Sequence, residues 1–397
     1  MFHITSPNKT WNYPLARTLL LMVPFDLLAS LGMDIYLPAL PGMGEFFSAS
    51  PFMVQLTLSL YMLMLGCGQL IFGPLSDRYG RRPVLLFGCL LFVICSIGLT
   101  MTGSIELFIF FRLCQAAGGS AALVATFATV RDVYGHKPES ATLYALLGGM
   151  LAFVPALGPI VGSLLIGWFG WASVFWGLAV SGSVAGVHAL FSWPETHCSV
   201  GGGSIKHAFG RVITSPAFLL YTSGFTVAMG SFFVYFSIAP GILIGKLGYS
   251  SLVFSLLFAM AAVAMIIVSR FAGSIARKFG ISGTLKLGMA VILAGALLML
   301  LGSTLQLPEA PVLLLPMMVI AVGISITCSV CATGALAEFK DIAGTGVALY
   351  YCLEAVLVCL LGTAVVMLFP VGSLWPLIAF SGIGSLVVMA SAAWINK

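Results

Sequence analysis

The sequence contains very little charge for its length. Only 7% of its 397 residues are Asp, Glu, Lys or Arg, whereas 60% are hydrophobic, and a water-soluble domain carries about 25% charged residues. Because so few charges could not cover a surface in water, lipid must be the main solvent. The apolar runs are long and do not alternate with polar residues, which excludes a membrane β-barrel. The sequence therefore predicts an all-α membrane protein.

Signatures of several other function classes are also missing. The segment GGGSIK lacks the spacing of a phosphate loop, and G-x-x-x-x-G-K-[ST] occurs nowhere else, so ATP is not bound in that way. Neither H-E-x-x-H nor G-x-S-x-G occurs, and the five His are scattered, which disfavours a membrane enzyme. The nine Cys form no disulfide framework, and the pair Cys328 and Cys331 is interpreted as packing residues. We expect no enzyme activity, no metal and no cofactor.

Twelve apolar segments are long enough to cross a bilayer, which takes about 20 residues in a helix. They cover approximately residues 17–40, 53–74, 83–102, 106–130, 140–166, 170–192, 216–240, 252–270, 282–303, 309–332, 342–368 and 372–394. The longest polar interval, 193–215, carries Pro, Gly, Ser and mixed charge, and we expect it to be a cytoplasmic linker. It would divide the chain into two six-helix bundles, 1–192 and 216–397.

The basic residues predict the orientation of these segments. If the N-terminus is cytoplasmic, 15 of the 17 Lys and Arg fall at the cytoplasmic face, with Lys246 outside and Arg112 within a span. This asymmetry follows the positive-inside rule. We therefore expect both termini in the cytoplasm. The net charge of +5 is explained by topology, so a nucleic-acid partner is not expected.

A short pattern recurs after the second and eighth segments. GPLSDRYG occupies residues 73–80 and GSIARKFG occupies 273–280, an offset of 200 residues with matching glycine, basic and aromatic positions. A parallel repeat of two six-helix halves, related by an axis along the membrane normal, explains both the pattern and the number of spans.

The first copy of this pattern also carries a resemblance. GPLSDRYGRRPVL resembles the signature G-x-L-x-D-R-x-G-R-[RK] of the loop between spans two and three in the Major Facilitator Superfamily, which implies a gating role. We expect Gly73 to allow close helix approach, Asp77 to meet a helix N-terminus or nearby arginines, and Arg81 and Arg82 to contact the anionic leaflet. The residues assigned to gating here, together with Arg131, are Gly73, Asp77, Arg78, Gly80, Arg81 and Arg82.

Two further motifs extend the resemblance. FFRLCQAAGGSAA, 110–122, resembles the R-x-x-Q-G-x-G motif of proton-driven transporters at Arg112 and Gln115, with Ala116 in place of the first Gly. MLAFVPALGPIVGS, 150–163, resembles the span-five motif of antiporters at Gly158, Pro159 and Gly162, whose role is again conformational. Long blocks, among them PFDLLASLGMDIYLPALP and GALAEFKDIAG, resemble the chloramphenicol and florfenicol exporters of that superfamily.

The resemblance implies both a fold and a function. The fold is the major facilitator fold of two pseudo-symmetric bundles. The function is a proton-coupled antiporter that exports phenicol antibiotics from the cytoplasm by alternating access and confers resistance. Its partners are a drug, protons and the bilayer, and a monomer without an obligate protein partner is expected. The alternative is an exporter of the same fold for a sugar, a metabolite or a cationic drug.

Four ionisable residues fall within the predicted spans: Asp26, Asp34, Arg112 and Glu354. Each costs from ~2.5 kcal/mol upward near the bilayer centre, so such a group usually faces a cavity and has a role. We assign all four to proton coupling. Helical rise places Arg112 near the depth of Asp34, with Asp26 deeper, so we expect Arg112 to pair with or lie close to Asp34 and Asp26 to be freer. Asp26 is thus the first candidate for coupling proton and drug.

Two questions about these spans stay open at the level of sequence. Glu354 either adds a proton or substrate site or is a neutral, hydrogen-bonded acid. Aromatic residues in spans two and seven would suit an aromatic drug, but they could equally fill the core. The residues predicted to bind substrate, together with Asp26, are Tyr61, Phe232, Phe233, Tyr235 and Phe236.

Overall fold

The computed structural model describes residues 11–135, 137, 139, 142–143, 146–147, 153–196, 210–339 and 343–395. Every regular element in these residues is a helix, which confirms the all-α prediction. The two termini and much of the predicted linker, 197–209, lie outside the described residues.

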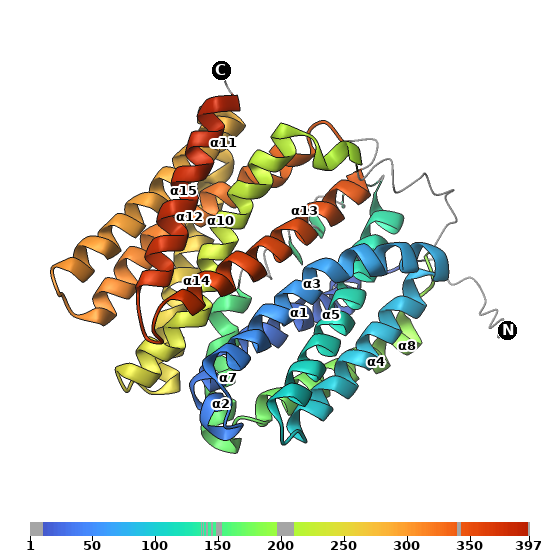
Figure 1. Cartoon of the computed structure of the whole chain (residues 1–397). Coiled ribbons are helices and arrows are strands. Elements are labelled where there is room, and N and C mark those ends of the chain that lie inside the picture. The colour runs from blue at the N-terminus through green and yellow to red at the C-terminus, as the bar shows by residue number, and fades with distance from the viewer. Residues whose placement is uncertain are drawn as a thin grey trace.

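The chain before the linker forms one group of helices, in the lower right of Figure 1. These are α1 (Leu15–Asp34), the 3₁₀ turn η1 (Leu37–Ala39), α2 (Leu40–Phe46), α3 (Pro51–Tyr79), α4 (Arg81–Thr100), α5 (Ile105–Tyr134), α7 (Val154–Phe169) and α8 (Ser173–Ser192).

The chain after the linker forms the second group. These helices are α10 (Pro216–Pro240), the π-helical turn η2 (Gly241–Lys246), α11 (Ser251–Thr304), α12 (Glu309–Leu336), α13 (Ala343–Leu357), the π-helical turn η4 (Val358–Gly362), α14 (Thr363–Leu368) and α15 (Trp375–Ile395).

The number of membrane-crossing helices is consistent with twelve. Ten helices of the described residues are long and apolar enough to cross a bilayer, and α7 is a shorter apolar helix. One of the ten, α11, has 54 residues and contains Gly280 in a non-helical conformation. It therefore comprises two helices that meet at Gly280, in agreement with the two spans that the sequence predicted there.

Backbone geometry supports the predicted repeat. Gly80 has φ 100° and ψ 159°, and Gly280, 200 residues later, has φ 69° and ψ 174°. Positive φ in this region is open to glycine at little cost. Eight residues beyond each of them, Gly88 and Gly288 bring two helices into backbone contact, because a Cβ there would meet the carbonyl oxygens of Gly118 and Gly323 at 2.7 and 3.1 Å.

The two groups of helices touch mainly through α3 with α13 and α7 with α11. Gln55 donates to the Ser237 hydroxyl (2.9 Å), Ser59 and Thr363 share a hydrogen bond (2.6 Å), and a Cβ at Gly66 would lie 2.2 Å from Cβ of Ala355. These contacts extend from the Pro51 end of α3 past its middle. Near the other end, a Cβ at Gly73 would meet nothing within 4 Å, so the expected close helix approach at Gly73 is wrong in this conformation.

Candidate functional site

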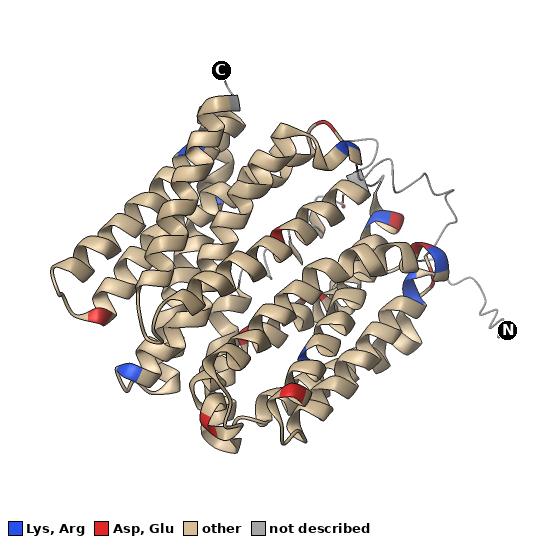
Figure 2. Cartoon of the chain, viewed as in Figure 1, with Lys and Arg blue, Asp and Glu red and all other residues tan. Residues whose placement is uncertain are grey.

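Charge is distributed unevenly along the helices. Figure 2 shows most coloured positions at helix ends, and only a few within the ribbons. Asp26, Asp34, Arg112 and Glu354 are all buried, with exposed fractions between 0 and 5%. The sequence therefore identified charged groups that are shielded from both lipid and water in this conformation.

Asp26 lies near the middle of α1, two residues after Pro24. Its side chain is fully buried, and neither carboxylate oxygen has a hydrogen-bond partner in the described residues. A charged carboxylate without partners is unstable in an apolar setting. Asp26 is therefore a buried acid whose charged form no described residue stabilises by a hydrogen bond.

Arg112 of α5 is held by backbone oxygens and aromatic rings. Its Nη1 donates to Gly32 O (2.6 Å) and Gln115 Oε1 (2.8 Å), and its guanidinium carbon lies 4.1 and 5.1 Å from the ring centres of Tyr61 and Tyr36. Such contacts replace the water that a buried cation loses.

The predicted pairing of Arg112 with Asp34 is not present in this conformation. No ion pair within 4.0 Å joins them in the described part of the chain, because Arg112 bonds the Gly32 carbonyl instead. The prediction of similar depth is confirmed, since Gly32 lies two residues before Asp34. Arg112 Nη2 is buried without a partner, so one donor of this cation remains available.

The R-x-x-Q motif continues into a chain of hydrogen bonds. Gln115 Nε2 donates to the Ser96 hydroxyl (2.8 Å), and Ser96 donates to Phe92 O (2.7 Å). The tight packing that the motif implies occurs at Gly118, where a Cβ would lie 2.6 Å from Gly88 O. Ala116, which replaces the first motif glycine, is buried without disturbing this contact.

The antiporter-like motif packs α7 against the end of α1. A Cβ at Gly158 would lie 2.8 Å from Cβ of Asp34, and one at Gly162 would lie 2.1 Å from Ile35 O. Pro159 lies between them, and its carbonyl accepts a hydrogen bond from Ser255 of α11 (2.8 Å). The predicted small-residue face is therefore confirmed, and α7 lies between the two helix groups.

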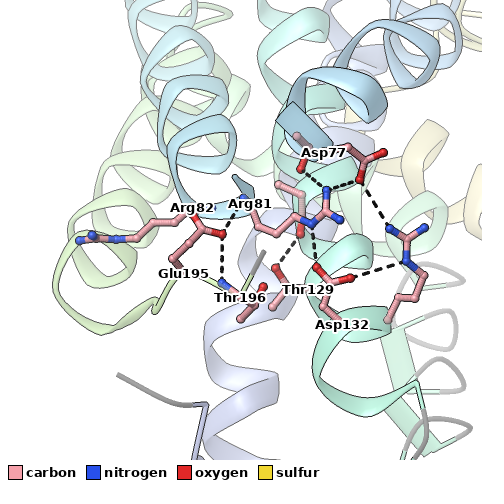
Figure 3. A network of polar contacts seen from close by, with 10 residues as sticks. Asp77, Arg81, Arg82, Thr129, Asp132, Glu195 and Thr196 are labelled. Atoms are coloured by element: carbon pink, nitrogen blue, oxygen red, sulfur yellow. Dashed lines mark hydrogen bonds and ion pairs between the residues drawn. The ribbon is translucent and has the colours of Figure 1, made fainter. Parts of the chain in front are cut away.

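The loop signature forms a network of ionic contacts at the other end of the first group (Figure 3). Arg81 donates to Asp77 Oδ1 through Nη1 (2.6 Å) and to Asp132 Oδ2 through Nε (2.7 Å). Arg131 lies 3.7 Å from each of these two aspartates. Since the Arg81 side chain is only 4% exposed and that of Arg131 is 55% exposed, water screens the ion pairs of Arg81 less than those of Arg131.

Glu195 was not predicted, yet it completes this network. It follows α8 and accepts hydrogen bonds from the backbone N–H groups of Arg81 (2.9 Å) and Arg82 (3.2 Å). A carboxylate at this position caps the N-terminus of α4. Any side chain at Gly80 would collide with it, since a Cβ there lies 2.5 Å from Glu195 Oε2.

Burial of Arg81 is inconsistent with the expected contact of this residue with lipid head groups in this conformation, whereas the contact of the half-buried Arg82 stays a prediction. Arg81 is 3% exposed and is held by Asp77 and Asp132, while Arg82 donates to Leu190 O (2.6 Å). Two carboxylates bind the guanidinium group of Arg81, and a backbone carbonyl oxygen binds that of Arg82. Arg78 lies outside this network, with its guanidinium 5.3 Å from the ring centre of Tyr79.

The predicted aromatic residues are packed together in this conformation. Tyr61 donates to Ala29 O (2.7 Å) beside Arg112. Phe232, Phe233, Tyr235 and Phe236 are at most 5% exposed, and Tyr235 stacks on Phe258 of α11 with ring centres 4.8 Å apart. In this conformation these aromatic side chains belong to the hydrophobic core. Their role as substrate contacts stays a prediction.

Comparisons with known proteins show the family and the fold of this chain. The model of the Major Facilitator Superfamily matches residues 26–363. A chloramphenicol resistance protein of Pseudomonas aeruginosa is 45% identical over 95% of this chain and 90% of its own length. The chloramphenicol resistance protein CraA of Acinetobacter baumannii is 27% identical over 86% of this chain and 82% of its own. The crystal structure of a D-xylose–proton symporter superposes with a TM-score of 0.77 at 16% identity, covering 94% of this chain and 97% of that one.

Proposed function

This chain belongs to the Major Facilitator Superfamily, and from that premise we propose that it exports chloramphenicol-like antibiotics in exchange for protons. The superfamily consists of multi-pass membrane transporters. The similarity to a chloramphenicol resistance protein over 95% of the chain supports a phenicol as the substrate. The proposal places the protein in the bacterial inner membrane as a monomer, with both termini in the cytoplasm and no cofactor beyond the coupling proton.

The observation that carries the proton coupling is the isolation of Asp26. Both of its oxygens are buried without partners, so in this conformation a bound proton would neutralise the group. Water or the hydroxyl and amide donors of a drug would stabilise the ionised form when they reach it. Proton and drug would then compete for Asp26, which couples their movement in opposite directions.

The contacts between the two helix groups support an inward-open conformation within this scheme. They run from the Pro51 end of α3 to beyond its middle, while Gly73 faces open space. With the proposed orientation, the Pro51 end of α3 is external. The contacts there close the external side. The network around Arg81 would be rearranged when the cytoplasmic side closes, which agrees with the gating role proposed for this loop.

The proton gradient supplies enough free energy for resistance. One proton moving through ~100 mV yields about 2.3 kcal/mol, and one pH unit adds about 1.4 kcal/mol. At one-to-one exchange the sum supports a roughly 500-fold gradient of a neutral drug. Export therefore needs no ATP.

Everted membrane vesicles with labelled chloramphenicol test the proposal. We expect an imposed proton gradient to drive uptake by the wild type and an uncoupler to abolish it. Asp26→Asn, which cannot release a proton, should lose at least about 90% of gradient-driven uptake. Glu106→Gln is the matched control, because Glu106 is an exposed acid in the first turn of α5. Uptake that ignores the gradient, or full activity of Asp26→Asn, would refute the mechanism.

A further inference from the structure

A second isolated carboxyl group lies in the other helix group, on α13. Figure 2 shows an acidic position interrupting the α13 ribbon, and Glu354 is the acid of this helix. Its side chain is 5% exposed, and its Oε1 is buried without a hydrogen-bond partner. Within the described residues it forms no ion pair. A buried acid that only fixes helix packing is normally hydrogen-bonded, and this oxygen lacks such a partner in the described residues.

Aromatic rings flank this carboxyl group. Tyr350 and Tyr351 precede Glu354 by four and three residues on α13, which places them beside it on the helix surface. Phe225 of α10 stacks on Tyr350 with ring centres 4.8 Å apart and meets Tyr351 at 5.9 Å, and the two tyrosines are 5.2 Å apart. Tyr351 is 37% exposed, so the cluster of three rings has an accessible edge.

Among the described residues, no Lys or Arg forms an ion pair with Glu354. Its electrostatic neighbours include the Cys328 thiol of α12 and the hydroxyl groups of Tyr350 and Tyr351. The Tyr350 hydroxyl is itself buried without a partner. Four residues after Glu354, α13 gives way to the π-helical turn Val358–Gly362, and such turns are frequent at functional sites.

We propose that Glu354, with the rings of Phe225, Tyr350 and Tyr351, forms a subsite for a lipophilic organic cation. The carboxylate would neutralise an ammonium or phosphonium charge, and the faces of the rings would bind its apolar groups through cation–π and stacking contacts. A neutral phenicol has no need for such an anion. The inference rests on the proposed drug export and extends its substrates to aromatic or alkyl cations.

Ligand binding by the purified full-length protein tests this subsite. The probes are labelled tetraphenylphosphonium and labelled chloramphenicol, measured in parallel at one pH. We expect Glu354→Gln to lower the ratio of phosphonium to chloramphenicol affinity at least tenfold and Glu354→Asp to restore most of it. Glu106→Gln, an exposed acid distant in sequence, is the control and should keep the wild-type ratio.

A second variant keeps the test valid if Glu354→Gln folds poorly. Tyr351→Leu removes the partly exposed ring, keeps an apolar side chain and should also lower the ratio, while elution as a single species reports folding. An unchanged ratio in both variants, or a wild type that binds chloramphenicol but not tetraphenylphosphonium, would overturn the subsite. A wild type that binds or transports no chloramphenicol would instead overturn the proposed function, whatever the cation result.

Discussion

At the scale of single residues, Gly162 has the least room for a Cβ among the glycines that the structure describes. A Cβ there would lie 2.1 Å from the carbonyl oxygen of Ile35, a backbone atom that cannot rotate away. We predict that Gly162→Ala forces α7 away from α1 and costs on the order of 1–3 kcal/mol. The measurement is the thermal unfolding temperature in detergent, together with chloramphenicol resistance of cells that express the variant.

The same helix provides the control for this substitution. A Cβ at Gly167 of α7 would meet nothing within 4 Å, so Gly167→Ala should leave both the unfolding temperature and resistance unchanged. Equal unfolding temperatures for the two variants would contradict the packing of α7 on α1.

Single residues also show what the sequence could and could not predict. Low charge and helical rise identified Asp26 and Arg112 as ionisable groups inside the helix bundle, and placed Arg112 beside the end of α1 that carries Asp34. These features could not identify the partner of Arg112. Every residue has a backbone carbonyl oxygen, so the sequence does not distinguish Gly32 from any other residue as an acceptor. For the same reason Glu195 was missed, since its ligands are backbone N–H groups.

At the scale of helices, α3 and α13 carry a thiol pair that tests whether the helix groups separate. Cys67 of α3 and Cys352 of α13 have sulfur atoms 3.4 Å apart, near enough to form a disulfide after a small movement. An added thiol oxidant such as copper phenanthroline would accept two electrons, and the two thiols would release two protons. We predict that the resulting bond joins the groups and stops transport, and that dithiothreitol restores it.

Peptide mass spectrometry and vesicle transport measure this prediction together. Cys67→Ser is the control, because it removes the bond between the groups but keeps Cys95 and Cys114, a hydrogen-bonded pair within the first group. Full transport by protein in which the Cys67–Cys352 bond has formed would mean that α3 and α13 do not separate during export.

At the scale of the whole molecule, the repeat was the most informative feature of the sequence. It predicted that Gly80 and Gly280 are equivalent, and both have the positive φ that a sharp helix-to-helix junction needs. It could not predict that the two helices meeting at Gly280 have no further loop residues between them, because that depends on how the following helix packs. The boundaries of the two bundles and of the linker stay predictions, since 197–209 lies outside the described residues.

The distribution of basic residues makes a prediction for the whole molecule. From Ser251 to Lys278, α11 rises about 40 Å, so Lys246, just before it, and Lys278 lie at opposite ends. Lys246 is exposed and pairs with Glu309, and Lys278 is exposed beside Gly280. With native cysteines replaced by serine, we expect an impermeant maleimide to label Lys246→Cys in intact cells and Lys278→Cys only after permeabilisation. The reverse pattern would invert the proposed topology, and the contacts at the Pro51 end of α3 would then close the cytoplasmic side.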